Sequence, residues 1–360
     1  MKVLLLVPPL NKNGGVANFY KTLFPYLENK IDFFTFSTSE HAGTCAKLIS
    51  LLKDLILFCR LLFRSRYDIV FLNPSLGVTA VIRDGLYCLI AGRLFQKKLF
   101  VFWHGWNKEY ERHLEYSRIS SAFLRFAFFQ AETMCVLAKE FKTCLEKWGY
   151  QGKILQKTTA FPDELLQFTK ISSDKHFTLL FLARLEKAKG IYEAIEYFEL
   201  LSKQYPAQVR LTIAGSGSEE IKVRDYVKSR QLQNVEFTGY IQGKKKYQLL
   251  ADADCYLFSS SHGEGLPCSI LEAMGAGLPI ITSVSGGISD FFEDGKMGFM
   301  IPVTARSVWV EKLMELLNKP ELRQQIGNFN RQYAQKYFCA SKVAEQLLKD
   351  LLELYKQGRN

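Results

Sequence analysis

The sequence has no pair of cysteines in a C-x-x-C arrangement, although eight cysteines occur in its 360 residues. Structural zinc sites and small disulfide frameworks need closely spaced or paired cysteines. The wide spacing of the cysteines in this sequence therefore argues against both kinds of site. We expect reduced thiols in a cytoplasmic protein. The eight stand apart from one another, at positions 45, 59, 88, 135, 144, 255, 268 and 339.

Long apolar runs are also missing. A helix that crosses a bilayer needs about 18 or more uncharged residues, and no stretch of that kind occurs. The most apolar segment, residues 48–63, carries Lys53, Asp54 and Arg60. The opening run "MKVLLLV" stops at two prolines and has no small-residue cleavage site after it. It therefore predicts a buried first strand and not a signal peptide.

Negative charge is scarce in the first half of the chain. Residues 1–170 hold 23 Lys and Arg against 14 Asp and Glu, whereas residues 171–360 hold 24 against 22. Nearly all of the net charge of +11 therefore lies in the first half. That bias suits an anionic surface or substrate, and ordinary solubility charge explains it equally well. No basic stretch is interleaved with aromatic residues, so nucleic acid is not an expected partner.

Short apolar runs alternate with helical patterns twice along the chain. Such nearly uninterrupted apolar runs favour parallel strands that are covered on both faces of the sheet. The two successive β/α series predict an α/β protein with two doubly wound, Rossmann-like domains facing across a cleft. We place the domains at 1–165 and 166–340, with a helix at 341–360 packing back towards the N-terminal domain. The predicted strands are 2–8, 31–36, 67–73, 98–105, 133–138, 177–184, 209–215, 234–239, 255–260 and 278–284.

Two features at predicted strand ends favour a phosphate ligand. Gly14 and Gly15 lie between the first strand and the first helix, where backbone N–H groups are free to bind an anion. A tight turn would explain this pair as well, because the G-x-G-x-x-G fingerprint of dinucleotide sites is absent. Arg184 and Lys189 follow a second-domain strand, and together they suit a diphosphate. The alternative is a solvated charge pair.

Two glutamates stand in a glycine-rich stretch, "HGEGLPCSILEAMGAG". Glu264 falls on a loop before a predicted helix, close to the amides of Gly265 and Leu266, and Glu272 falls inside that helix. We expect Pro267 at the first position of that helix, and Gly275 and Gly277 at its end. Carboxylates accept hydrogen bonds from vicinal hydroxyl groups, which predicts contacts to a sugar and a ribose. The helix dipole alone explains Glu264 well, but it does not explain Glu272 on an otherwise apolar helix.

The stretch from "HGEGLPCSILEAMGAG" to "GGISDFFEDGKMGFM" resembles the C-terminal signature of glycosyltransferase family 4, which has the GT-B fold. The E-x7-E pair corresponds to Glu264 and Glu272. "ARLEKAKG" looks like the family's G-R-L-x-x-x-K-G, and "NVEFTGYI" resembles another of its segments. The resemblance covers essentially the whole second domain and is thinner in the first, where "FWHG" and Gly14–Gly15 are similar.

The resemblance implies a retaining, metal-independent enzyme that uses a UDP- or GDP-type sugar and needs no cofactor. Arg184 and Lys189 would hold the diphosphate, Glu272 the ribose, and Glu264 the hydroxyl groups of the donor sugar. Backbone near Tyr240 and Ile241 would contact the base, and His104 would reach the transferred sugar. A histidine satisfied at a strand end is the alternative for His104. We expect His104, Arg184, Lys189 and Glu264 to be catalytic, and Gly14, Gly15, Arg184, Lys189, Tyr240, Ile241, Glu264, Gly265, Leu266 and Glu272 to bind the donor.

The sequence departs from the family pattern at several positions. Ala183 replaces a glycine, Asp290 stands where glutamate is common, and "TTAFPDELL" lacks the usual linker motif. Asp252-x-Asp254 resembles a metal-binding D-x-D, yet it falls at a helix end without convergent oxygen ligands, so we expect no metal. The run Lys244–Lys246 is expected to be a solvated loop.

The sequence favours a glycosyltransferase that acts on a glycan or lipid-linked acceptor in bacterial surface polysaccharide or glycolipid assembly. A catalytically silent nucleotide-sugar-binding subunit and a GT-B epimerase are the alternatives. The segments "CAKLISLLKDLILFCRLLFRSR" and "RISSAFLRFAFF" combine apolar bulk with cations, which suits an anionic membrane surface on the inner face of the cell membrane. Packing against the first sheet would explain them too.

Overall fold

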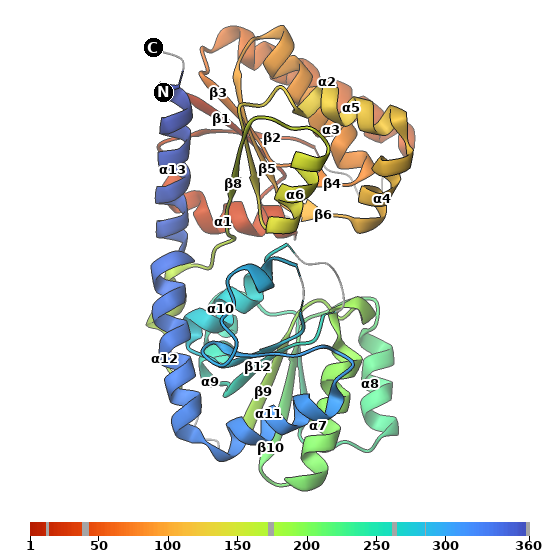
Figure 1. Cartoon of the computed structure of the whole chain (residues 1–360), viewed down its shortest axis with the longest axis vertical. Coiled ribbons are helices and arrows are strands. Elements are labelled where there is room, and N and C mark those ends of the chain that lie inside the picture. Colours follow the sequence, from red (N-terminus) through yellow and green to blue (C-terminus); the bar gives the residue numbers. More distant parts are fainter. Residues whose placement is uncertain (12–13, 38–42, 172–175, 261–264, 285, 358–360) are drawn as a thin grey trace. The chain divides into compact units, whose positions relative to one another are not determined.

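The computed structural model describes residues 1–357 except 12–13, 38–42, 172–175, 261–264 and 285 (Figure 1). The chain divides into two compact α/β units. The first contains the described residues of Met1–Ala160, Gly263–Leu266 and Ala340–Asn360. The second contains those of Phe161–His262 and Pro267–Cys339.

A six-stranded parallel sheet forms the centre of the first unit, in the order β2-β1-β3-β5-β7-β8. Its strands are β1 (Val3–Val7), β2 (Asp32–Thr35), β3 (Ile69–Leu72), β5 (Lys98–Trp103), β7 (Thr133–Val136) and β8 (Lys153–Gln156). The helices are α1 (Gly15–Leu27), α2 (Thr44–Arg64), α3 (Val78–Leu89), α4 (Lys108–Tyr116), α5 (Arg118–Phe128), α6 (Lys139–Lys147) and α13 (Ala340–Lys356), and α3 continues into a π-helical turn, Ile90–Leu94.

The C-terminal helix α13 belongs to the first unit, where it packs against α1 (Figure 1). The ammonium group of Lys98, at the start of β5, donates to the carbonyls of Leu354 (2.7 Å) and Gln357 (3.1 Å). Cations stabilise the negative end of a helix dipole, so Lys98 fastens the last turn of α13 to the sheet. A partly buried ion pair, Lys157–Asp350, adds a second attachment.

The second unit repeats the plan with a six-stranded parallel sheet in the order β11-β10-β9-β12-β13-β14. Its strands are β9 (Phe177–Leu182), β10 (Val209–Ala214), β11 (Val235–Gly239), β12 (Cys255–Phe258), β13 (Ile280–Thr282) and β14 (Gly298–Met300). The helices are α7 (Ile191–Gln204), α8 (Glu220–Ser229), α9 (Lys244–Asp252), α10 (Cys268–Ala276), α11 (Arg306–Asn318) and α12 (Pro320–Tyr337), with 3-10 turns at Asp163–Gln167, Lys187–Lys189 and Gly286–Asp290.

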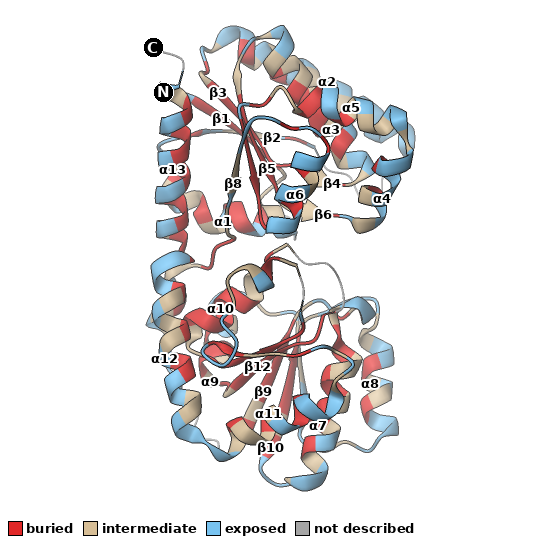
Figure 2. Ribbon diagram, in the orientation of Figure 1, coloured by how far each residue is buried: buried red, intermediate tan, exposed pale blue. Residues whose placement is uncertain are grey.

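Among the central strands, β1, β3 and β12 are buried along their whole length, and β5 and β9 are buried at every residue but one (Figure 2). In the second unit, Trp309 of α11 stacks on Tyr197 of α7 with ring centroids 4.6 Å apart. Fully burying one large apolar side chain stabilises a fold by roughly 1.5–3 kcal/mol. The two cores therefore hold the strand ends in fixed positions.

All ten predicted strands are present, with ends that differ by up to two residues. The sequence analysis missed β8 and β14, and the two-residue pair β4 (Ser75–Leu76) with β6 (Gly105–Trp106). Two expectations for α10 need correction: Pro267 is the residue before the helix and not its first, and Gly275 lies inside it. The left-handed backbone of Gly277 (φ 84°) ends the helix, as expected.

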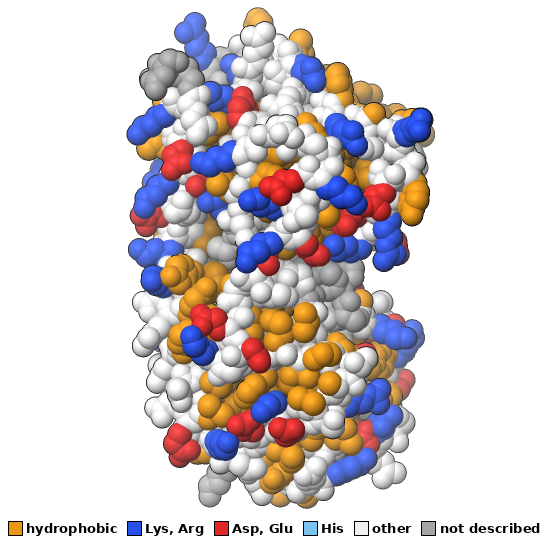
Figure 3. Space-filling model, viewed as in Figure 1, with side chains coloured by type: hydrophobic (Ala, Val, Ile, Leu, Met, Phe, Trp, Pro, Cys, Tyr) orange, Lys and Arg blue, Asp and Glu red, His pale blue; other side chains and the backbone are white. Residues whose placement is uncertain are grey.

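Lys and Arg side chains are spread over the first unit on the face shown in Figure 3, without gathering into one patch. Among the helices that the structure describes, none combines the length and hydropathy that crossing a membrane requires.

Candidate active site

The carboxyl edge of the second sheet is held together by contacts that leave no room for a side chain at two glycines. A Cβ on Gly190 (φ +79°) would lie 2.0 Å from the carbonyl oxygen of Ser259, which follows β12. A Cβ on Gly215 (φ +141°) would lie 1.9 Å from the carbonyl oxygen of Ala183, which follows β9. Only glycine fits such close approaches. The loops that follow β9, β10 and β12 are therefore packed backbone to backbone.

Arg184 and Lys189 both lie on the loop that follows β9. The strand ends at Leu182, so Arg184 stands two residues beyond it and not at its last position. Its side chain is 70% exposed, and Nη1 lies 2.7 Å from Oε1 of Glu186. An exposed ion pair of this kind contributes about 0–1 kcal/mol, so an anionic ligand can displace Glu186 at little cost.

Lys189 ends the 3-10 turn before Gly190, and its side chain is half-buried. Two hydroxyl groups from the end of β12 fix this turn. Ser259 Oγ donates to the carbonyl of Gly190 (2.6 Å), and Ser260 Oγ donates to that of Ala188 (3.1 Å). The two cations therefore lie on one anchored loop at the carboxyl edge of a parallel sheet, which is where open α/β sheets bind ligands.

Glu272 lies buried in the middle of α10, as expected. Its Oε1 is 2.6 Å from Nζ of Lys246 on α9, and the two side chains are 9% and 20% exposed. Burial acts to lower the pKa of Lys246, but the charge of Glu272 and its hydrogen bond outweigh that effect and raise it. Lys246 is therefore a charged partner of the acid that was predicted to bind ribose.

Lys246 was missed by the sequence analysis, which assigned Lys244–Lys246 to a solvated loop. That expectation was wrong, because these residues form the first turn of α9. The spacing of the apolar residues on this helix could have indicated that Lys246 is partly buried. Tyr247, Leu250 and Ala251 are buried, so the lysine next to Tyr247 stands at the border of the buried face while Lys244 and Lys245 point to solvent.

Tyr240 and Ile241 follow β11, the outer strand of the second sheet. Tyr240 is 52% exposed and Ile241 is half-buried. The amide of Gly215 donates to the carbonyl of Gly239 (2.9 Å), which ties the ends of β10 and β11 together. Both residues therefore stand at the same edge of the sheet as Arg184.

Glu264 lies outside the described residues. Gly265 and Leu266 are assigned to the first unit. Leu266 is buried, and its carbonyl accepts a hydrogen bond from Thr159 Oγ1 (3.1 Å). A Cβ on Gly265 would lie 3.5 Å from the carbonyl oxygen of His104. The structure thus brings Gly265 close to His104.

His104 follows β5 and is half-buried. Its ring nitrogen Nε2 lies 3.0 Å from Oδ1 of Asn73, at the end of β3. The rings of Phe102 and Phe19 lie against it, with centroid distances of 4.1 and 5.0 Å. Burial lowers the pKa of His104 to about 3. The imidazole is therefore neutral at physiological pH.

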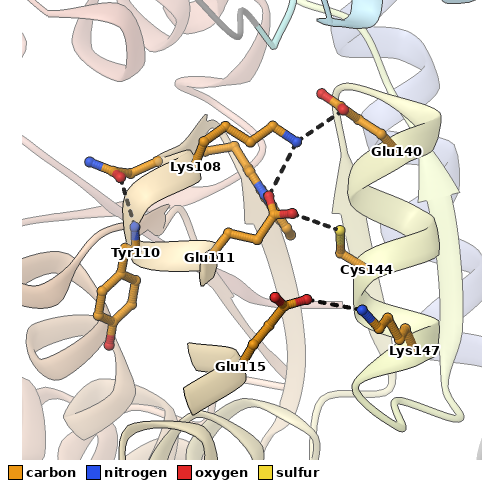
Figure 4. Close-up of polar contacts among 9 residues, drawn as sticks. Lys108, Tyr110, Glu111, Glu115, Glu140, Cys144 and Lys147 are labelled. Atoms are coloured by element: carbon orange, nitrogen blue, oxygen red, sulfur yellow. Dashed lines mark hydrogen bonds and ion pairs between the residues drawn. The ribbon is translucent and has the colours of Figure 1, made fainter. Parts of the chain in front are cut away.

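The chain after His104 is held by a polar network between α4 and α6 (Figure 4). Lys108 bridges Glu111 (3.2 Å) and Glu140 (3.0 Å), and Lys147 pairs with Glu115 at 2.9 Å. Trp106 of β6, whose indole N–H donates to Glu111, stacks on Phe141 and Trp148. His104 is thus fixed on both sides, by β5 before it and β6 after it.

Gly15 is the first residue of α1 and Gly14 precedes it, and both are exposed. Among the described residues no side chain caps the helix, and a Cβ on either glycine would have no described heavy atom within 4 Å. Space alone does not require glycine here, in contrast to Gly190.

The D-x-D aspartates serve a structural purpose. Asp254 accepts hydrogen bonds from the ammonium of Lys170 (2.7 Å) and the amide of Thr178 (2.9 Å). Asp252 accepts one from the amide of Ile171 (2.9 Å). Among the residues that the structure describes, no three His, Cys, Asp or Glu side chains come close enough to hold a metal ion.

The predicted donor residues therefore fall in two groups. Arg184, Lys189, Tyr240, Ile241 and Glu272 belong to the second unit, and the first four follow its strand ends. His104, Gly14, Gly15, Gly265 and Leu266 belong to the first unit.

Comparisons with known proteins bear on both groups. Residues 163–333, which include Arg184, Lys189 and Glu272, match the family model described as glycosyl transferases group 1. The structure also resembles that of HepE (Alr3699) from Anabaena in complex with UDP and glucose, with a TM-score of 0.76 and 17% identity over 98% of this chain and 99% of that one. The fold is GT-B. The predicted fold class of two Rossmann-like α/β domains is confirmed.

Curated relatives match the chain over shorter lengths. Spore coat protein SA of Bacillus subtilis is 30% identical over 188 residues, 50% of this chain and 49% of the relative. The capsular polysaccharide biosynthesis glycosyltransferase CapM of Staphylococcus aureus is 27% identical over 216 residues, 59% of this chain and 55% of the relative. The chain spans about half the length of these two relatives. Together the matches show the GT-B fold and a similarity to glycosyl transferases group 1 over residues 163–333.

Proposed function

We propose that the protein is a retaining glycosyltransferase that moves a sugar from a UDP- or GDP-type donor to a glycan or lipid-linked acceptor. The observation that carries the proposal is the carboxyl edge of the second sheet. There Arg184 and Lys189 lie on one anchored loop, within the segment that matches the group 1 family model. A guanidinium and an ammonium on the same loop suit a diphosphate.

Glu272 would bind the ribose. Lys246 occupies Oε1 of its carboxylate, and among the described residues no contact to Oε2 is recorded. A carboxylate accepts hydrogen bonds at both oxygens, so Oε2 is left to accept from a hydroxyl group. Backbone near Tyr240 and Ile241, which are exposed and half-buried at the carboxyl edge of the sheet, would contact the base.

The reaction would depend on electrostatic stabilisation of the leaving group. Cleavage of the sugar–phosphate bond leaves negative charge on the diphosphate, which Arg184 and Lys189 would stabilise. In a front-face mechanism the departing phosphate oxygen takes the proton of the attacking acceptor hydroxyl, so no protein nucleophile is needed. We propose a metal-independent reaction in which the D-x-D aspartates take no part, because they are bonded to Lys170 and to the backbone at Ile171 and Thr178.

Surface polysaccharide or glycolipid assembly in bacteria is the proposed pathway class. Relatives named for capsular polysaccharide and colanic acid biosynthesis support it. A lipid-linked acceptor would place the protein at the inner face of the membrane. In support, the exposed surface of α2 combines apolar side chains with cations, at positions Lys47, Leu48, Ile49, Leu52, Lys53, Ile56, Leu57, Arg60, Phe63 and Arg64.

Donor turnover separates this proposal from its two alternatives. A glycosyltransferase should hydrolyse its donor slowly without acceptor, and Arg184→Ala should abolish that hydrolysis. A silent binding subunit would bind the donor without consuming it. An epimerase would release an altered sugar nucleotide with no acceptor present. A thermal-shift panel of UDP, GDP, ADP and their sugars identifies the donor first, because a tight ligand raises the melting temperature by mass action.

A further inference from the structure

Two side chains and one backbone carbonyl from different parts of the first unit meet at Asn73. The hydroxyl group of Tyr20, on α1, donates to Asn73 Oδ1. Nε2 of His104 lies 3.0 Å from the same oxygen. Asn73 Nδ2 donates to the carbonyl of Leu6, in β1, at 2.9 Å. Tyr20 and Asn73 are buried, whereas His104 is half-buried.

The orientation of the Asn73 amide follows from chemistry. The carbonyl of Leu6 can only accept, so the NH2 group of Asn73 must face it and Oδ1 must face the other two side chains. Oδ1 is an acceptor with two lone pairs. It can take one proton from Tyr20 and one from His104, so His104 must carry its proton on Nε2. In a neutral imidazole, Nδ1 is then an unprotonated acceptor.

We propose that Asn73 and Tyr20 are positioning residues that lock His104 in its Nε2–H tautomer and leave Nδ1 to accept a hydrogen bond from a hydroxyl group of the transferred sugar. The identity of the ligand in this inference rests on the proposed function. The tautomer does not, because it follows from the contacts of Asn73. Tyr20 acts by holding Asn73, and Asn73 acts by holding His104.

The whole network is uncharged, which keeps the tautomer fixed across a wide pH range. Burial lowers the pKa of His104 to about 3. The titratable groups recorded beside the network are Tyr20 itself and Cys135 of β7, and burial raises the pKa of both far above neutrality. The rings of Phe19 and Phe102 add no charge. A general base works best with a pKa near the operating pH, so this histidine is suited to fixed hydrogen bonding and not to proton transfer.

A long-range ¹H–¹⁵N NMR spectrum of the protein with ¹⁵N-labelled histidine tests the tautomer directly. Comparison with the spectrum of His104→Gln assigns the resonances among the five histidines. We expect a protonated Nε2 and an unprotonated Nδ1, unchanged from pH 5 to 8. A protonated Nδ1, or averaged signals from both tautomers, overturns the inference whether or not the protein binds a sugar nucleotide.

Variants test the positioning. Asn73→Ala removes the acceptor for Nε2–H, and we expect kcat/KM for donor hydrolysis to fall about tenfold, the loss of one hydrogen bond, while affinity for the free nucleoside diphosphate stays unchanged. Asn73→Asp places a carboxylate beside the ring, which favours the imidazolium. Its pH profile should acquire a limb between about pH 5 and 8 that the wild type lacks.

Tyr20→Phe keeps the ring and both bonds of Asn73 to Leu6 and His104. Tyr20→Phe should therefore reduce kcat/KM by less than Asn73→Ala does. This difference separates the positioning role of Asn73 from a general loss of packing. Equal losses of sugar-nucleotide and nucleoside-diphosphate affinity in Asn73→Ala, or an unchanged pH profile in Asn73→Asp, contradict the inference. If the wild type binds no sugar nucleotide, the proposed function and the sugar contact of His104 both fail, while the NMR result on the tautomer still stands.

Discussion

The ammonium of Lys246 lies 2.6 Å from Oε1 of Glu272, and both side chains are largely withdrawn from solvent. This ion pair joins α9 to the middle of α10. A buried charge that loses its partner is costly, whereas a buried pair adds little over well-packed apolar residues. Lys246 therefore fixes the orientation of the Glu272 carboxylate, which we expect to bind ribose.

Lys246→Met should destabilise the second unit by about 2–3 kcal/mol, below the range for a fully buried pair because Lys246 retains some exposure. Urea unfolding of the variant and the wild type measures this cost. The double variant Lys246→Met/Glu272→Leu should regain most of the lost stability while binding the donor less tightly. A double variant no more stable than Lys246→Met would show that the pair does not act as a unit.

Arg184→Ala should leave stability unchanged and weaken nucleoside-diphosphate binding about 100-fold, since a charged hydrogen bond to phosphate contributes about 1.5–3 kcal/mol. Calorimetry measures the affinity. Glu186→Gln is the matched control, because it removes the partner of Arg184 but leaves the guanidinium in place. It should bind the ligand at least as tightly as the wild type. Weakened binding in Glu186→Gln would argue against Arg184 as the phosphate ligand.

Gly190→Ala should be strongly destabilising, by more than about 2 kcal/mol, because the new Cβ adds a clash with the Ser259 carbonyl to the strain of a left-handed backbone. Gly295→Ala provides the comparison. Its φ of +80° is nearly the same, yet a Cβ there would meet nothing within 4 Å. Only the strain of about 1–2 kcal/mol should remain. Similar melting temperatures for the two variants would show that the loop after β9 can move away from β12.

His104 should make the first unit less stable in acid. Because burial lowers its pKa to about 3, the unfolded chain takes up a proton below pH 6.5 that the folded protein does not. The stability present above pH 6.5 is then lost as the pH falls towards 3, by about 2 kcal/mol at pH 5. His104→Gln should reduce this loss. Urea midpoints of both proteins at pH 7 and pH 5 test the difference, which would be zero if His104 titrated normally.

Membrane binding through α2 predicts salt-sensitive pelleting with vesicles that contain phosphatidylserine, and little pelleting with vesicles of phosphatidylcholine alone. Leu52→Glu/Ile56→Glu, on the exposed face of α2, should abolish it. Ile221→Glu changes another apolar, exposed residue, on α8 of the second unit, and should not abolish pelleting. Equal pelleting of all three proteins would remove α2 as the contact.

The sequence predicted the strands well because continuous apolar runs are diagnostic of buried parallel strands. It missed β8, "KILQ", whose residues are half-buried or exposed at the edge of the sheet, and β14, which has three residues. Short or half-polar edge strands lack the apolar signal. Gly277 was recognised as the end of α10 because a left-handed residue there is almost always glycine.

The side-chain partners could not be predicted in the same way. Tyr20 and Asn73 are 53 positions apart, and their meeting with His104 depends on β1, β3 and β5 lying side by side. Lys246 and Glu272 come from different helices, and a run of three lysines gives no sign of which one turns inward. Such contacts depend on register and helix phase, which a single sequence leaves open.

Titration calorimetry of the wild type and Arg184→Ala with UDP, GDP and their sugars is the most direct test of the central claim, that the loop after β9 grips the diphosphate of a sugar nucleotide. We predict saturable binding of one nucleotide class by the wild type, weakened about 100-fold in the variant. Absence of heat with every nucleotide, or equal affinity of the two proteins, would contradict the account.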